Sequence, residues 1–353
     1  MNLDRAEEIL KGYDRLKIAI VGDFCLDRYF EIDPARSEIS IETGLEVYNV
    51  TRVRTQAGAA GTILNNLVTL GIPEIHAIGF CGEDAEGWLL QKALGTLEGV
   101  QTNHFIKTQQ RATFTYSKPL VCKPNQPPVE KNRLDQKNWT PTPTEVSKQI
   151  CKSLEELIPS VDALIIMDQV DIEDTGVITK EVLSQLGSMQ KAFPEKLMIA
   201  DSRRGLKSYP HLTYKMNLNE LSTWKGLEEA TPDHIRQEAL KITQQTGHKI
   251  FVSMADQGII GMDSDGSHAH APSLPIRGPI DIVGAGDSVT ANLCAALAAG
   301  ATMEESLQLS MLAASCVIHQ LGTTGTASTT DLLKLAKKEK SEGNQVIRLI
   351  TSA

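Results

Sequence analysis

The sequence predicts an α/β protein with three layers, α/β/α, built on a mostly parallel central sheet and carrying a small lid of β-strands. The first observation is the alternation of short apolar runs with helical stretches along most of the chain. The second is that two segments, about 29–55 and 101–139, break this alternation. We therefore expect residues 1–353 to form one domain, with these two segments inserted as the lid.

Short runs of apolar or β-branched residues predict strands that are buried on both faces. They are Leu16–Gly22, Ala163–Met167, Leu197–Ala200 and Ile250–Met254, and Thr213–Met216 is a further expected strand. The intervening stretches have helical character and include Gly61–Leu70, Glu83–Leu97, Pro143–Leu157 and Pro232–Thr246. This order is typical of a parallel sheet covered by helices on both sides.

The two lid segments alternate polar and apolar residues, as in Thr113–Tyr116, and the second contains a loop with three prolines at Lys123–Pro128. We expect antiparallel strands in both. A separate hairpin is predicted at Gly258–His270, because Asp265-Gly266 favours a two-residue turn. Thr302 and Glu305 predict a capping box at the start of the helix that follows them.

The segment Asp281–Asp287 leads into a predicted helix, Ser288–Ala299, and combines glycines, a carboxylate and a helix start. Glycine allows close approach of the backbone to an anion and permits a positive φ. Amide groups at a helix start bind anions, so Gly284, Ala285 and Gly286 are expected to hold a phosphoryl group. Asp287 could then accept a proton from an attacking hydroxyl, as phosphoryl transfer requires. The alternative is an ordinary helix N-cap after a glycine turn.

Composition limits the possible partners. The formal net charge of −9 disfavours general nucleic-acid binding, although local basic residues such as Arg52, Arg54, Arg203 and Arg204 leave an anionic small substrate possible. No apolar run approaches the roughly 20 residues that span a bilayer. The six cysteines form no Cys-x-x-Cys pair, and we expect reduced thiols in a cytosolic protein.

Other chemistries lack their motifs. The chain has no Gly-x-x-x-x-Gly-Lys-Ser/Thr sequence, and no Gly-x-Gly-x-x-Gly follows the first strand, so a P-loop NTPase and a dinucleotide oxidoreductase are disfavoured. His268 and His270 form a close pair in the predicted hairpin but lack a third ligand. We therefore expect a solvated strand there and no metal site.

Several motifs, in order, resemble those of the PfkB (ribokinase-like) carbohydrate kinases. Gly284-Ala285-Gly286-Asp287 resembles the carboxy-terminal signature of that family, and Gly58 through Asn66 to Gly71 its first signature. Asn217-Leu218-Asn219-Glu220 resembles its Asn-x-x-Glu motif, and Gly322-Thr323 its closing Gly-Thr. Within the family, Gly22–Tyr29 and the lid motif Arg133-Leu134-Asp135 resemble the D-glycero-D-manno-heptose phosphate kinase branch.

The resemblance implies a ribokinase-like fold and ATP-dependent phosphorylation of a hydroxyl on a sugar or sugar phosphate, with Asp287 as base. For the acceptor it implies Asp27, with Asp23, Gly58, Asn66 and Arg133 as further candidates. For the nucleotide and Mg²⁺ it implies Asn217 and Glu220, with Glu220 acting on the metal through water. Further nucleotide-site candidates are Ser253, Asp256, Gly258, Asp281 and Arg203 or Arg204. The family often uses K⁺ near Asp281 and the closing Gly-Thr, and its lid often forms a homodimer.

Departures from the branch leave the substrate open. Ala59 and Thr62 replace a glycine and an asparagine of the first signature, Ala255 replaces a nucleotide-loop glycine, and Val283 replaces a threonine. Asp168-Gln169-Val170-Asp171 also lacks the Asp-Tyr-Gly-Lys pattern. None of these changes removes a catalytic carboxylate. One alternative is a nucleoside kinase, which would need an aromatic lid contact from Tyr29, Phe30, Tyr48 or Phe114. Another is a sugar- or nucleotide-binding sensor without turnover.

Overall fold

The computed structural model describes residues 1–227 and 231–341, so positions 228–230 and 342–353 of the predicted single domain lie outside the described residues. Within the described part, the central sheet has ten strands in the order β17-β16-β15-β14-β13-β12-β1-β6-β7, with β8 beside β6. All pairs from β15 across the sheet to β7 and β8 are parallel, whereas β16 pairs antiparallel with both β15 and β17. The predicted fold class is confirmed. The strands are β1 Lys17–Gly22, β6 Glu74–Gly82, β7 Val100–Gln101, β8 Phe105–Thr108, β12 Ala163–Asp168, β13 Leu197–Ser202, β14 Thr213–Asn217, β15 Ile250–Ser253, β16 Ile259–Met262 and β17 His268–Ala271.

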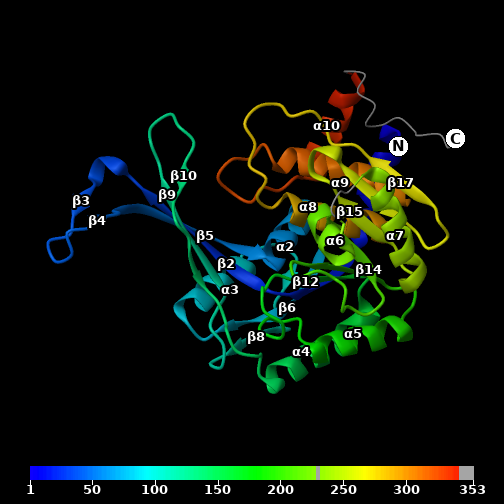
Figure 1. Cartoon of the computed structure of the whole chain (residues 1–353), viewed down its shortest axis with the longest axis horizontal. Coiled ribbons are helices and arrows are strands. Elements are labelled where there is room, and N and C mark those ends of the chain that lie inside the picture. The colour runs from blue at the N-terminus through cyan, green and yellow to red at the C-terminus, as the bar shows by residue number, and fades with distance from the viewer. Residues whose placement is uncertain (228–230, 342–353) are drawn as a thin grey trace.

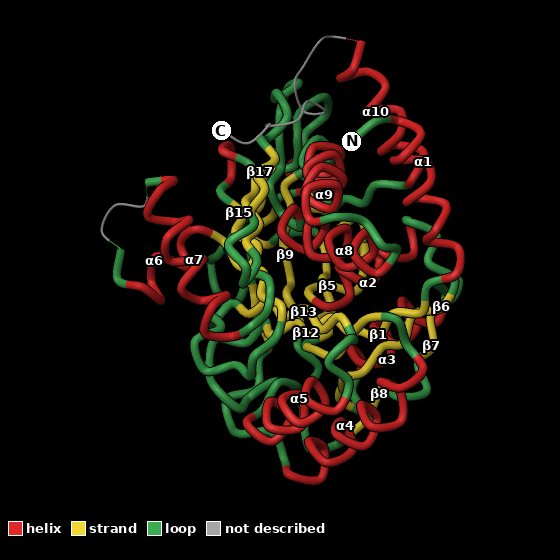
Figure 2. Tube along the Cα trace, turned by 90° about the vertical axis from the view of Figure 1, so that its right-hand side faces the viewer, coloured by secondary structure: helices red, strands yellow, loops and turns green. Residues whose placement is uncertain are grey.

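Helices cover both faces of this sheet (Figure 2). Because side chains alternate along a strand, β1 sends Ile18 and Ile20 into one hydrophobic core and Ala19 and Val21 into the other. The first core is completed by α1 Leu3–Lys11, α2 Ala60–Thr69, α8 Ala285–Ala298, α9 Met303–Val317 and α10 Thr329–Ser341. The second is completed by α4 Thr144–Leu157, α5 Lys180–Ala192, α6 Leu218–Lys225 and α7 Pro232–Thr246. Helix α3, Ala85–Gly95, contacts β2, β5 and β6.

The expected strands and helices are present, and their bounds differ from the expected ones by a few residues. The predicted hairpin is formed by β16 and β17, but residues 263–267 join its strands in place of the expected two-residue turn. Thr302 and Glu305 form the predicted capping box. Sequence reasoning did not identify β6, α5, α6 or α10. In β6, Glu74 and His76 interrupt the apolar pattern at the edge of the core, which hides a strand whose remaining residues are buried.

The lid is a second sheet with the strand order β10-β9-β2-β5, in which β11 also pairs with β9. It projects from the α/β core, with the short strands β3 and β4 at its tip (Figure 1). Its strands are β2 Phe24–Ile32, β5 Val50–Ala59, β9 Thr115–Val121, β10 Val129–Glu130 and β11 Leu134–Gln136, and the tip strands are β3 Glu38–Ile39 and β4 Glu46–Val47.

Two expectations for the lid were wrong in detail. Strands β2 and β9 pair in parallel, although β2 with β5 and β9 with β10 and β11 are antiparallel. In addition, β8 lies within segment 101–139 but belongs to the central sheet. The physical reason is that Phe105 of β8 packs edge-on against Phe24 at a centroid distance of 5.3 Å, which holds β8 on the edge of the core.

Candidate active site

The start of α8 offers free amide groups at the carboxyl-terminal edge of the sheet. Gly284 is the N-cap, with φ 84°, and a Cβ there would lie 3.2 Å from the Cβ of Thr324. In the described residues the amides of Gly286 and Asp287 have no hydrogen-bond acceptor, whereas the amide of Ala285 donates to the carbonyl of Ile282 at 3.2 Å. Free amides at a helix start attract anions. The anion site at this helix start thus includes the free amides of Gly286 and Asp287, whereas Ala285, an expected cradle residue, uses its amide within the turn.

The side chain of Asp287 is half-buried at this helix start and has no hydrogen-bond partner among the described residues. Burial, together with the negative charge of Asp201, raises the pKa of Asp287 to about 7, and the nearby Lys215 opposes this shift. The charge of Asp27 adds a smaller increase to the pKa of Asp287, so the two carboxylates are close enough to interact electrostatically. A carboxylate with a pKa near 7 suits a general base at neutral pH.

Lys215 is a residue of this site that sequence reasoning missed. Its Nζ lies 2.7 Å from Oδ2 of Asp201, which also accepts a hydrogen bond from Thr290 Oγ1 at 2.8 Å. A Cβ on Gly286 would lie 3.4 Å from Nζ of Lys215, so the ammonium group adjoins the cradle. Burial lowers the pKa of Lys215, but Asp201, Glu220 and Asp287 outweigh it, and the net shift is upward. The sequence signal for this buried pair was a lysine within an expected buried strand, because a buried lysine is almost always paired.

Asn217 and Glu220 form a capping box on α6. The side chain of Asn217 accepts from the amide of Glu220 at 2.9 Å, and Oε2 of Glu220 accepts from the amide of Asn217 at 2.8 Å. Burial and the charge of Asp201 raise the pKa of Glu220. In residues 1–227 and 231–341 no cluster of three His, Cys, Asp or Glu side chains is suited to a metal ion. The second oxygen of Glu220 still fits Mg²⁺, which binds through few carboxylates and keeps several waters.

The predicted nucleotide loop after β15 contains a short 3₁₀ helix, Ala255–Gln257. Gly258 has φ 87°, and a Cβ there would lie 2.0 Å from the carbonyl oxygen of Ala271, so glycine is required to pack this loop against β17. Asp256 is exposed, and Ser253 Oγ donates to the carbonyl of Met216 at 3.4 Å. Ala255 keeps a positive φ of 52°. The loop therefore retains a glycine-type conformation at the position where glycine is missing.

On the lid side, Asp27 of β2 is 4% exposed and lies 3.1 Å from Nζ of Lys118 on β9. Burial raises the pKa of Asp27, although Lys118 opposes the shift. A Cβ on Gly58 would lie 2.8 Å from Oδ2 of Asp27, which explains the glycine of the first signature. Lys118, which sequence reasoning did not identify, comes from a strand about 90 residues later and meets Asp27 only in the folded lid.

Three predicted residues do not reach this space. Asp23 is fully buried, and its carboxylate accepts hydrogen bonds from the amides of Gln169, Val170 and Val177 at 2.8, 3.3 and 2.7 Å. Asn66 is fully buried on α2 and donates to the carbonyl of Thr62 at 2.9 Å. Arg204 is held by Asp168, with a distance of 2.7 Å between Nη2 and Oδ2.

These contacts correct the expected roles. Asp23 fastens the end of β1 to the loop after β12, because a buried carboxylate needs hydrogen-bond donors. Asn66 serves helix packing. Arg204 compensates a buried carboxylate, whereas its neighbour Arg203 is exposed and lowers the pKa of Glu220 by its charge.

Two remaining predicted residues hold loops in place. Arg133 makes a bidentate pair with Asp135, at 2.7 and 2.8 Å, and its guanidinium lies 4.8 Å from the ring centroid of Tyr116. Asp281 accepts from the amides of Val283 and Gly322, each at 3.1 Å. Asp281 therefore joins the segment before the cradle to the closing Gly-Thr.

The family model described as pfkB family carbohydrate kinase matches residues 16–330. The chain belongs to this family. A curated relative, bifunctional protein HldE of Trichlorobacter lovleyi, is 26% identical over 350 residues, which cover 99% of this chain and 68% of that protein. HldE of Azorhizobium caulinodans is 28% identical, over 87% of this chain and 61% of that protein. The chain thus spans about two thirds of these relatives, which agree with the predicted heptose phosphate kinase branch.

Solved structures share the fold. Phosphofructokinase-2 from Escherichia coli, in complex with substrates and products, aligns with a TM-score of 0.71 at 20% identity, over 92% of this chain and 99% of that one. The same enzyme has also been solved with potassium. Arabidopsis thaliana ribokinase, complexed with ribose and ATP, aligns with a TM-score of 0.66 at 21% identity, over 91% and 99%. The predicted enzyme class, a carbohydrate kinase of the PfkB type, is confirmed.

Among residues 1–227 and 231–341, no helix is both long and apolar enough to cross a membrane. The six cysteines are free. The cytosolic location expected from them stays a prediction.

Proposed function

We propose that this kinase transfers the γ-phosphoryl group of ATP to a hydroxyl of a sugar or sugar phosphate, with Asp287 as the general base. One observation carries the proposal: Asp287, with a pKa near 7, stands beside unpartnered amides and within electrostatic reach of Asp27. A base, an anion site and an acceptor ligand therefore share one space, as phosphoryl transfer requires.

In the proposed reaction, Asp27 accepts hydrogen bonds from acceptor hydroxyls and orients the attacking one. Asp287 takes the proton of that hydroxyl as the new O–P bond forms to the γ-phosphorus, and the bond from this phosphorus to the β,γ-bridging oxygen of ATP breaks, so that ADP leaves with the electron pair. The amides of Gly286 and Asp287, with the ammonium of Lys215, stabilise negative charge on the moving phosphoryl oxygens. Mg²⁺, when bound through Glu220, would neutralise charge on the nucleotide phosphates.

Basic groups on the inner face of the lid are the candidates for binding the phosphate of a sugar-phosphate acceptor. The ammonium of Lys118 and the guanidinium of Arg54 lie 4.9 and 4.7 Å from the ring centroid of Tyr29, and Arg133 directly precedes β11. Each cation is already paired with a carboxylate: Lys118 with Asp27, Arg54 with Glu31 and Arg133 with Asp135. The face therefore carries no excess positive charge, and both a sugar and a sugar phosphate stay open as acceptors.

The same face weakens the nucleoside kinase alternative, which needs an open aromatic ring to stack on a base. Cations already lie over the ring of Tyr29, and Arg28 lies 5.0 Å from the ring centroid of Phe30. Phe114 is 2% exposed, and Tyr48 lies at the lid tip.

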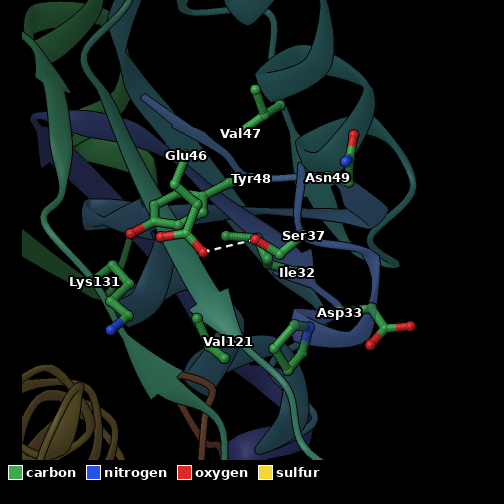
Figure 3. A pocket seen from close by; sticks show the side chains of 10 residues that line it. Ile32, Asp33, Ser37, Glu46, Val47, Tyr48, Asn49, Val121 and Lys131 are labelled. Atoms are coloured by element: carbon green, nitrogen blue, oxygen red, sulfur yellow. Dashed lines mark hydrogen bonds between the residues drawn. The ribbon is translucent and has the colours of Figure 1, made fainter. Parts of the chain in front are cut away.

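We also propose that the lid forms a homodimer contact. The lid tip exposes large apolar side chains, including Ile39, Ile41 and Leu45. A cavity of about 170 Å³ opens beside them between Ile32, Val121 and the segment 46–49, where Glu46 accepts a hydrogen bond from Ser37 (Figure 3). Apolar groups of this kind on a protein surface favour burial against another chain. A monomeric mass at micromolar concentration would count against the dimer.

A monovalent cation near Asp281 is a further proposal. Both oxygens of this carboxylate accept backbone amides from the two loops that border the cradle, so K⁺ bound there would fix both loops. A comparison of turnover in KCl and in tetramethylammonium chloride tests it, and equal rates would exclude the cation.

The deciding experiment measures ADP formation with Mg²⁺ and K⁺ across sugars, sugar phosphates and nucleosides. With the productive acceptor, Asp287→Asn should lower kcat by at least about 10²-fold. Asp233→Asn, which removes an exposed carboxylate of α7, is the matched control and should keep full activity. Binding of ATP or sugar without acceptor-dependent turnover would favour the sensor alternative.

A further inference from the structure

The closing Gly-Thr loop is tied to the lid by side chains of β5. Nε2 of Gln56 donates to Oγ1 of Thr324, and Oε1 of Gln56 accepts from Oγ1 of Thr323 at 3.4 Å. Nη2 of Arg54 donates to the carbonyl of Gly322 at 3.3 Å. Residues about 270 positions apart in the sequence are thus joined at one point.

Gln56 also connects to the acceptor carboxylate. Its Nε2 lies 3.3 Å from the hydroxyl of Tyr29, to which Nζ of Lys118 donates at 3.4 Å. Lys118 is the partner of Asp27, at 3.1 Å. A continuous set of polar contacts therefore runs from the proposed acceptor ligand to the closing loop.

The closing loop in turn supports the phosphoryl cradle. Thr324 packs against Gly284, because a Cβ on that glycine would lie 3.2 Å from the Cβ of Thr324. The amide of Gly322 donates to Asp281, which also holds the amide of Val283 just before the cradle. A shift of residues 322–324 would therefore move the cradle relative to the lid.

We infer that Gln56 is a positioning residue that couples the acceptor-binding strand of the lid to the phosphoryl cradle through Thr323 and Thr324. This inference rests on the proposed function for its kinetic consequence. A carboxamide offers both a donor and an acceptor, so it can bind two hydroxyls of one loop and a third on the lid. Without it, the loop and the cradle lose their fixed distance from the bound acceptor, and water competes better for the phosphoryl group.

The kinetic test compares Gln56→Ala, Thr324→Val and the double variant with the wild type. Misplacement of the cradle by about 1 Å is expected to lower kcat for the acceptor by about 10²-fold. KM for ATP should change little, while ADP formed per acceptor phosphorylated should rise. If both residues act through one contact, the double variant should be no slower than Gln56→Ala alone. Thr55→Val is the control, because neighbouring residues of a strand point to opposite faces. Additive losses would overturn the inference.

An activity-free readout separates this inference from the proposed function. Hydrogen exchange of the amides in residues 320–326 should become faster in Gln56→Ala and stay unchanged in Thr55→Val. Should the alanine variant fail to fold, Gln56→Asn, whose amide is one methylene too short, should give the same acceleration. Unchanged exchange in a folded Gln56 variant would overturn the coupling. If the wild type phosphorylates no acceptor, the proposed function fails, and the exchange result still decides the inference.

Discussion

The conformation of Ala59 provides a test of how the chain tolerates the loss of a signature glycine. This residue is the N-cap of α2 and has φ 54° and ψ −115°, a region that glycine enters freely and other residues rarely. Backbone strain of this kind costs about 1–3 kcal/mol. Ala59→Gly would remove it.

Two smaller effects oppose the gain. Glycine increases the conformational entropy of the unfolded chain, which costs about 0.4–1 kcal/mol. The methyl group of Ala59 is partly buried against one hydrophobic core, and its loss costs up to about 0.8 kcal/mol. At the middle of these ranges, the strain that is relieved exceeds the two losses together, so Ala59→Gly should stabilise the folded state by about 1 kcal/mol.

The assay is urea unfolding at equilibrium, followed by circular dichroism and by tryptophan fluorescence, with coincident transitions as the condition for comparing free energies. Ala59→Gly should raise the midpoint without changing the slope. Ala314→Gly is the matched control, because Ala314 is a half-buried residue inside α9, where glycine should destabilise by about 0.5–1 kcal/mol. Equal losses in both variants would refute the strain argument.

Four further predictions concern the site. The rate of phosphoryl transfer should fall as the pH drops below about 7, because Asp287 acts only when deprotonated and burial raises its pKa to about 7. A pH profile of kcat checks this prediction. A flat profile from pH 5 to 8 would contradict it. The same raised pKa means that the folded state holds this proton more tightly, so the contribution of Asp287 to stability should decrease as the pH rises from about 4 to 7. Arg204→Met should destabilise the fold by about 3 kcal/mol, because it leaves the buried carboxylate of Asp168 without a cation and with only the hydroxyls of Ser202 and Tyr209 as donors. KM for ATP should not change; a large rise in that KM would restore the predicted phosphate contact. Gly58→Ala should raise KM for the acceptor and spare KM for ATP, since the added Cβ displaces the carboxylate of Asp27; isothermal titration with each ligand separates the two effects.

The features that were predictable from sequence are local. The strands of the central sheet are visible because burial on both faces demands continuous apolar runs, and the cradle is visible because its glycines and Asp287 are contiguous. The Asn217–Glu220 motif was identified, but its capping box was not, although the box uses the same two side chains. The spacing of Asn217 and Glu220 alone does not show how many of their side-chain oxygens remain free to bind a ligand.

The residues that were missed or misassigned depend on contacts between distant segments. Lys118 meets Asp27 only because β9 pairs in parallel with β2, an arrangement that no local pattern specifies. Arg204 was expected at a phosphate, but the fold places it against Asp168, a carboxylate at the end of β12, which pairs with the strand before Arg204. The role of a basic residue in a loop depends on the buried carboxylate nearest to it. The order of strands in the sheet decides which carboxylate that is.

The two glycine replacements bear on whether the chain turns over a substrate. Ala59 and Ala255 both keep a positive φ, of 54° and 52°, so the backbone follows the course that glycine would allow, at a cost in strain. Strain of this kind persists only where the surroundings over-determine the conformation. A binding protein relieved of catalysis would have no reason to hold the acceptor strand and the nucleotide loop in strained conformations while also keeping an unpartnered carboxylate at Asp287. The retained geometry at both loops therefore favours an active kinase over a sensor.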